Sequence, residues 1–217
     1  MDRLRCRIGV LDLKNPLIAA AGEHMIDASG VEGAIRAGAG AVVVKSTNES
    51  QPAKDKLRRA EYMTFGPDWR PAAWGADAPA DVTLASRSGL TPQSFDQWLS
   101  QAVVLDKLAR QHDCMLVASL ILADLDQAEG LARQVEQAGL RALEFNIGTP
   151  YASQAAKGAV STELLPERVR AIVSHIRAAV SLPLGIKLTG QSERVPELAE
   201  VAFDSGADSV VMAGRLL

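Results

Sequence analysis

In the second half of the chain, short apolar runs alternate with longer segments in which apolar residues recur every three or four positions. The apolar runs predict buried strands, and the longer segments predict helices with one buried face. Glycines and a proline fall where the helices end and the next strands begin. This pattern predicts strands at 115–122, 142–146, 184–188 and 209–213, and helices at 125–138, 166–179 and 195–205. Strict alternation of strand and helix is typical of a parallel sheet with helical crossovers.

The first half carries the same pattern with one interruption. It predicts a hairpin at 5–13, strands at 15–22 and 41–44, and helices at 27–37 and 94–111. Between 48 and 80 the pattern dissolves into charges, prolines and aromatic residues. A long segment without a regular pattern inside a compact domain is usually functional. We therefore expect 48–80 to be an irregular insertion over the active-site face.

These elements predict an α/β fold of the TIM (β/α)8 type, with about six βα units in the chain. We expect residues 1–217 to form a single barrel domain. A complete barrel of this type typically has about 250 residues. An open barrel would expose two strand edges, which favours aggregation. The expectation is therefore that the last two βα units are missing from the chain as given or are supplied by another chain.

Composition and charge exclude several classes of partner. Hydrophobic residues make up 47%, and 23 Lys and Arg against 26 Asp and Glu leave a net charge of -3 without a basic block, which disfavours nucleic acid. No apolar run approaches the about 20 residues that span a bilayer, and no signal-peptide core follows the N-terminus. Cys6 and Cys114 have neither disulfide nor metal-ligand spacing. We expect a cytoplasmic protein with no membrane segment and no metal site.

Polar residues stand where several predicted strands end. Asn146 closes the apolar strand before Gly148, while Lys45 with Ser46 and Lys187 continue two others. In parallel α/β folds ligands bind at the carboxyl ends of the strands. A strand-end asparagine is often only a structural amide, and a strand-end lysine often an ion-paired one. Lysines that directly continue apolar strands are rarer than an ion-pairing role alone would predict. The sequence therefore predicts a ligand site at these strand ends.

Taken together, these strand ends resemble the class 1 dihydroorotate dehydrogenases and the related pyrimidine-reducing domain of dihydropyrimidine dehydrogenase. The likeness runs from about residue 15 to residue 213. It rests on order and spacing of five motifs: Ala20-Ala21-Gly22, Val44-Lys45-Ser46-Thr47, Ser86-Arg87-Ser88-Gly89-Leu90, Glu144-Phe145-Asn146-Ile147-Gly148-Thr149-Pro150 and Gly185-Ile186-Lys187-Leu188-Thr189-Gly190. The resemblance implies a barrel that binds FMN and a small-molecule substrate.

The resemblance also implies roles for individual residues. Ala20, Ala21 and Gly22 would lie against the isoalloxazine ring, Lys45 and Ser46 would contact flavin and substrate, and Asn146 would bridge the two. Lys187 would reach the N1/O2 region, where an ammonium group stabilises the negative charge of reduced flavin. The substrate would also meet the loop with Ser86, Ser88, Gly89 and Leu90, and the residue at Tyr151.

Several positions depart from the family's pattern. Thr149 stands where the family has a Cys or Ser base, and a secondary hydroxyl is intrinsically a poor base. Ser86, Tyr151 and Ala213-Gly214 replace amide-bearing family residues that would grip a pyrimidine. Each lost partner of a buried polar group costs roughly 1–3 kcal/mol. We therefore expect a small cyclic or carboxylate substrate other than dihydroorotate, with Lys45 and Thr149 as the catalytic candidates and Arg87 and Tyr151 as candidates to line a different pocket.

Other interpretations stay open at this point. Residues 146–150 and 212–215 also resemble strand ends of tRNA-dihydrouridine synthases, although the acidic net charge and the missing loop cysteine disfavour that reading. The chain also fits a non-catalytic assembly subunit, or an aldolase-type barrel in which Lys187 forms a Schiff base. We expect a homodimer or a partner subunit that completes the site. The electron acceptor is not indicated.

Overall fold

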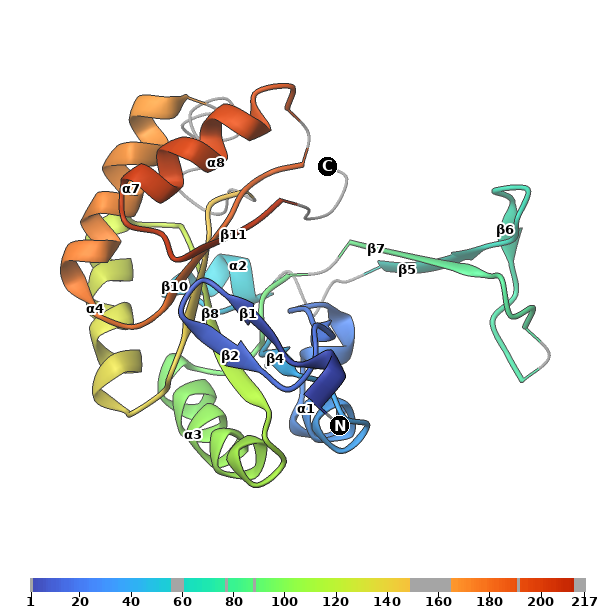
Figure 1. Cartoon of the computed structure of the whole chain (residues 1–217). Coiled ribbons are helices and arrows are strands. Elements are labelled where there is room, and N and C mark those ends of the chain that lie inside the picture. Colours follow the sequence, from blue (N-terminus) through green and yellow to red (C-terminus); the bar gives the residue numbers. More distant parts are fainter. Residues whose placement is uncertain are drawn as a thin grey trace.

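A computed structural model describes residues 2–55, 61–76, 78–87, 89–148, 165–190 and 192–212. Its centre is a six-stranded sheet in the order β11-β10-β9-β8-β4-β3, in which all neighbouring strands are parallel. Figure 1 shows this sheet curled into part of a barrel. The strands are β3 (Ile18–Ala19), β4 (Ala41–Val43), β8 (Met115–Ile121), β9 (Leu143–Asn146), β10 (Leu184–Lys187) and β11 (Ser209–Val211). The predicted α/β barrel class, with about six βα units, is confirmed.

Helices cover the outer face of the sheet (Figure 1). They are α1 (Ala28–Arg36), α3 (Phe95–Gln111), α4 (Leu125–Gln137), α7 (Pro166–Ala179) and α8 (Val195–Asp204). The short helices α2 (Gln51–Asp55), η1 (Asp2–Leu4) and η2 (Glu23–Met25) lie in connecting segments. Capping side chains set the starts of α1, α4 and α3: Asp27 accepts from the Gly30 N–H, Asp124 from that of Gln127, and Ser94 forms a capping box with Gln97. Such caps satisfy backbone donors that a helix start leaves unpaired.

The main core lies between the outer face of the sheet and these helices. Alternate strand residues point outward into it, and the largest of them are fully buried: Leu116, Leu120, Leu143, Phe145, Leu184 and Ile186. Ile172 and Ile176 of α7 belong to the same cluster. Because successive side chains of a strand point to opposite faces, the residues between these positions face the concave side. The polar strand residues Ser119, Glu144 and Asn146 are therefore on the concave side.

The predicted hairpin is present as β1 (Cys6–Ile8) and β2 (Leu11–Leu13), which pair antiparallel. Gly9 at its turn has φ 56°, and a Cβ there would come within 2.2 Å of the Asp208 carbonyl oxygen. The turn therefore packs directly on the chain that enters β11. Only glycine combines this backbone conformation with so close an approach.

The segment that follows β4 is more regular than the sequence predicted. It contains α2 and then β5 (Glu61–Phe65), β6 (Pro71–Ala72) and β7 (Thr83–Arg87), which form an antiparallel sheet in the order β6-β5-β7. This sheet extends away from the barrel as an arm (Figure 1). The expectation of an irregular insertion over 48–80 was wrong, because its charges and prolines hid the β-forming run at 61–65. Covering of the active site by this segment stays a prediction.

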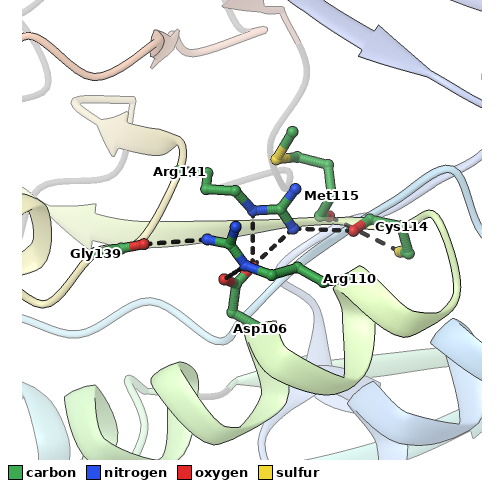
Figure 2. Close-up of polar contacts among 6 residues, drawn as sticks. All are labelled: Asp106, Arg110, Cys114, Met115, Gly139 and Arg141. Atoms are coloured by element: carbon green, nitrogen blue, oxygen red, sulfur yellow. Dashed lines mark hydrogen bonds and ion pairs between the residues drawn. The ribbon is translucent and has the colours of Figure 1, made fainter.

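A buried carboxylate holds the base of the barrel together (Figure 2). Asp106 of α3 accepts hydrogen bonds from Arg110 Nε at 2.7 Å and from Arg141 Nη2 at 2.8 Å. Arg141 also donates to the Cys114 carbonyl oxygen, and Arg110 to that of Gly139. The network joins α3 to the segments that enter β8 and β9. This end of a barrel usually serves stability, while ligands bind at the other end.

Neither a metal cluster nor a membrane-crossing helix is found among the residues that the structure describes. Within the described ranges, no three His, Cys, Asp or Glu side chains gather closely enough to hold a metal ion. The described helices are all too short or too polar to cross a bilayer.

Candidate functional site

A row of polar side chains, of which all but Lys187 are buried, crosses the concave face of the sheet. Ser46 Oγ lies 2.8 Å from Ser119 Oγ, and Ser119 Oγ donates to Glu144 Oε1 at 2.9 Å. Lys187 Nζ lies 4.0 Å from the same oxygen of Glu144. These residues come from β8, β9, β10 and the exit of β4. The parallel register therefore brings four separate segments into one polar layer.

Lys45 directly precedes Ser46 at the exit of β4, and its side chain is ion-paired and buried. Its Nζ donates to Glu23 Oε1 at 2.8 Å, and its side chain is only 9% exposed. The indole Nε1 of Trp98 donates to the Lys45 carbonyl oxygen at 2.9 Å, which fixes the backbone from α3. Tyr62 of the arm donates its hydroxyl to Glu23 Oε2 at 2.9 Å. Glu23 thus connects the arm to the lysine.

Asn146 lies between the two lysine-bearing segments. It is in register with Ile121 of β8 and with Lys187 of β10, so the Asn146 and Lys187 side chains are on the same face. Its Oδ1 accepts from the Gly148 N–H at 3.0 Å. A Cβ at Gly148 would meet the Leu188 backbone at 2.5 Å, so the exits of β9 and β10 touch there and require glycine. The structure therefore brings Lys45, Ser46, Asn146 and Lys187 to one end of the sheet.

The remaining predicted site residues differ in their surroundings. Ala20, Ala21 and Gly22 follow β3 directly and are at least partly exposed, and the imidazole ring of His24 lies beside Gly22. Ser86 is exposed in β7 of the arm, opposite Tyr62. Leu90 is buried against Ala53 and Ile121, and Gly89 next to it is also buried. Thr149, Tyr151 and Ser88 lie outside the described residues, as does the side chain of Arg87, so their roles stay predictions.

Three polar residues of this site were missed by the sequence analysis: Glu23, Ser119 and Glu144. A signal was present for two of them. Glu144 alternates with buried Leu143 and Phe145, and Glu23 directly follows the run of small residues. Ser119 gave no comparable signal, because a serine inside an apolar strand is common. The contacts of Glu23 and Glu144 with the two lysines arise only in the folded chain.

The contact between the arm and Glu23 can be tested by titration. Burial and, next, the hydrogen bond to Glu23 raise the pKa of the Tyr62 hydroxyl, because both disfavour the phenolate. Tyr62 and Tyr151 are the only tyrosines, so in a Tyr151→Phe background ultraviolet absorbance follows Tyr62 alone. We expect its midpoint to lie above the usual value of about 10. In Glu23→Gln the midpoint should fall towards that value, whereas Glu61→Gln, on the same strand as Tyr62, serves as the control. An unchanged midpoint in Glu23→Gln contradicts the contact.

Comparison with known proteins places the chain near one group of enzymes. It is 28% identical over 219 residues to the catalytic subunit of dihydroorotate dehydrogenase B (NAD(+)) from Methanocella arvoryzae, which is 99% of this chain and 62% of that protein. It is 28% identical over 210 residues to dihydroorotate dehydrogenase A (fumarate) from Lactobacillus helveticus, which is 95% of this chain and 61% of that protein. The catalytic subunit of dihydroorotate dehydrogenase B (NAD(+)) from Fusobacterium nucleatum is 22% identical over 217 residues, which is 100% of this chain and 64% of that protein.

Two further comparisons add little. No protein-family profile matches the chain. Among solved structures, the carboxyl transferase domain of Rhizobium etli pyruvate carboxylase overlaps 54% of this chain and 20% of its own, with 17% identity and a TM-score of 0.41.

The similarity is spread over this chain but not over the whole of its relatives. The chain spans about three fifths of their length, at 62% and 61% of the first two. The matched region holds the parallel strands and all the strand ends on which the resemblance depends. By its sequence, the chain is therefore related to the dihydroorotate dehydrogenases and resembles them over nearly its whole length.

Proposed function

We propose that the chain is the barrel of an FMN-dependent oxidoreductase that acts on a CH–CH bond of a small cyclic or carboxylate substrate. The observation that carries the proposal is the pair of lysines on either side of Asn146 at the carboxyl ends of the strands: Lys45, which is buried, and Lys187, whose side chain is 13% exposed. Lysines buried at the ligand-binding end of a barrel are expected where negative charge develops. Relatives named dihydroorotate dehydrogenases support the same reaction class.

The described residues fit a flavin. The small residues Ala20 and Gly22 leave space for a planar ring, and the ammonium group of Lys187 suits its electron-accepting edge. When bound, FMN supplies the two-electron acceptor that protein side chains lack. In this proposal Lys187 holds charge at the pyrimidine edge of the ring, and Asn146 orients ring and substrate. Thr149 is the proposed proton acceptor and Lys45 the second cation.

The substrate is proposed to differ from dihydroorotate. The replacements at Ser86 and Tyr151 remove amide groups that the family would use, as the sequence indicates. Glu23 adds a carboxylate at 2.8 Å from Lys45 Nζ, and this carboxylate partly neutralises the cation that an anionic substrate would need. Both features favour a substrate with less negative charge than dihydroorotate at this end of the site.

Partners and location follow from the family in this proposal. Two of the relatives named above are catalytic subunits, which supports a partner subunit, and a homodimer is the other proposed arrangement. We propose a cytoplasmic location and no nucleic-acid partner. The alternative is a barrel that only assembles with other proteins. Such a barrel would not need the charged side chains described above at its strand ends.

The proposal is tested by the colour and the titration behaviour of the purified protein. We expect a yellow protein with flavin absorbance bands that bleach on reduction, or a colourless one that takes up FMN in a fluorescence titration. A panel of dihydropyrimidines and small cyclic acids then identifies the compound that reduces the bound flavin under anaerobic conditions. A preparation that takes up no FMN would favour the assembly alternative.

A further inference from the structure

The carboxylate of Glu23 is shared between the barrel and the arm. Its Oε1 accepts from Lys45 Nζ at 2.8 Å, and its Oε2 accepts from the Tyr62 hydroxyl at 2.9 Å. Glu23 belongs to η2, Lys45 to the exit of β4, and Tyr62 to β5 of the arm. Two residues that lie 22 and 39 positions further along the chain than Glu23 therefore meet at the two oxygens of one group.

The barrel side of this contact stands on a fixed backbone. A Cβ at Gly30 would come within 1.8 Å of the His24 carbonyl oxygen, so α1 packs directly on η2 next to Glu23. The Lys45 N–H donates to the Met25 carbonyl oxygen at 3.1 Å, which joins the exit of β4 to η2. Met25 itself is buried in the main core. Glu23 and Lys45 are therefore held relative to each other by the core.

The arm, in contrast, buries little apolar surface. Tyr62 and Met63 of β5 are each 51% exposed, and Leu84 of β7 is 57% exposed. Since neighbouring side chains of a strand point to opposite faces, both faces of the arm meet solvent. Figure 1 shows the arm extending away from the barrel. A segment with so few apolar contacts takes its position from individual polar contacts, and the hydrogen bond from Tyr62 to Glu23 is one of them.

The two contacts of Glu23 depend on each other. A carboxylate is planar, so the position that Lys45 gives to Oε1 also fixes the direction of Oε2. The side chains of Lys45 and Glu23 are only 9% and 24% exposed, so solvent and salt screen their ion pair less than an exposed one. A change at Lys45 is therefore felt at Tyr62, and by linkage a change at Tyr62 is felt equally at Lys45.

We propose that Glu23 is a charge-dependent link between Lys45 and the arm, in which the ion pair with Lys45 orients the carboxylate that holds Tyr62. Whatever draws Lys45 away from Glu23 loosens the arm, and movement of the arm leaves Lys45 less firmly placed. The use of this link in regulation rests on the proposed function, in which Lys45 is a cation of the ligand site. It gives the arm a part in that site.

The test measures the position of the arm by double electron–electron resonance between two spin labels. One label is attached at Ala85→Cys, which is exposed and lies on the face of the arm opposite Tyr62, since Ala85 is in register with Met63. The other is attached at Phe203→Cys on α8, where the side chain is exposed. The parent for all comparisons carries Cys6→Ser and Cys114→Ala, so that only the two new cysteines are labelled.

We expect a narrow distance distribution in the parent and a clearly wider one when any member of the link is changed. Tyr62→Phe, Glu23→Ala and Lys45→Met should each make the distribution roughly twice as wide, because a segment with few buried contacts opens readily when one of them is lost. The double variant Tyr62→Phe/Glu23→Ala should be no wider than Glu23→Ala, since both changes remove the same hydrogen bond.

Controls separate the link from general effects of charge and folding. Glu32→Ala and Lys107→Met remove the same charges from well-exposed positions on α1 and α3, and the distribution should equal that of the parent. A second label pair, Val104→Cys and Phe203→Cys, lies on two barrel helices. Its distance should be the same in every variant, which shows that the barrel is intact.

The inference is overturned when Tyr62→Phe or Lys45→Met leaves the distribution unchanged, or when that of the parent is already broad. If Glu23→Ala does not fold, Tyr62→Phe decides, because it removes one hydroxyl and keeps the ring. FMN content is measured in parallel. A protein without FMN whose arm responds as expected refutes the proposed function alone, whereas a flavoprotein whose arm does not respond refutes only the link.

Discussion

Replacing Lys187 with methionine is expected to slow reduction of the bound flavin by about two to three orders of magnitude. The reason is that a preorganised charge in a buried site stabilises developing negative charge far more than it would in water, and loss of one such group costs about 2.7–4 kcal/mol. Methionine keeps most of the length of the lysine side chain and removes only the ammonium group. Anaerobic stopped-flow absorbance measures the rate, and FMN fluorescence measures affinity, which should also fall.

The matched control for this change is Lys107→Met, an exposed lysine on α3. It removes the same charge from the protein but not from the strand ends. Reduction rate and FMN affinity should equal those of the parent protein. If Lys187→Met reduces flavin at the parent rate with unchanged FMN affinity, then Lys187 has no role at the flavin. Loss of FMN without a change in the rate of the remaining holoenzyme would limit its role to binding.

Asp106→Ala is expected to destabilise the protein by about 3–5 kcal/mol, the usual range for breaking a buried ion pair from one side. The Asp106 side chain is 6% exposed and binds two arginines (Figure 2). Without it, Arg110 and Arg141 keep their positive charges near each other and lose their common acceptor. Urea unfolding followed by circular dichroism gives the change in free energy of unfolding. Among single replacements of a carboxylate by alanine in this barrel, we expect Asp106→Ala to lower the free energy of unfolding the most.

Glu32→Ala is the control for Asp106→Ala. Glu32 pairs with Arg36 at the same i,i+4 spacing as Asp106 with Arg110, but at 3.8 Å and with both side chains well exposed. Exposed pairs of this kind contribute about 0.2–1 kcal/mol. If both variants lose a similar amount of free energy of unfolding, then the buried network in Figure 2 stabilises the protein no more than an exposed ion pair does. FMN uptake by folded Asp106→Ala should be unchanged, because the network lies at the end of the barrel away from the site.

Much of the fold was predictable from local patterns. The predicted helix at 166–179 matches α7 (Pro166–Ala179), and the predicted strand at 142–146 matches β9 (Leu143–Asn146) to one residue. These elements carry strong periodic signals together with a proline or glycine at their ends. The arm was missed for the opposite reason. Its strands are short, and the charged and proline residues between them interrupt the alternation.

The candidate site was predicted only in part. Asn146, Lys45 and Lys187 stood out because each is polar at the end of an apolar run. Tyr62 did not, since it lies in a segment with no visible pattern. Its hydrogen bond to Glu23 joins residues 39 positions apart and becomes visible only in the folded chain. A tyrosine in such a segment carries no mark in the sequence that separates a solvated side chain from one that holds the segment in place.

The sequence by itself determined the order of strands and helices, because periods of 2 and of 3.6 residues and the capping residues are local properties of the chain. It also determined which strands end in lysine or asparagine. Only the tertiary structure decided that Lys45 meets Glu23 and that Lys187 approaches Glu144. Those contacts depend on strand register and on the curl of the sheet. Both are set by packing between segments far apart along the chain, which no local pattern encodes.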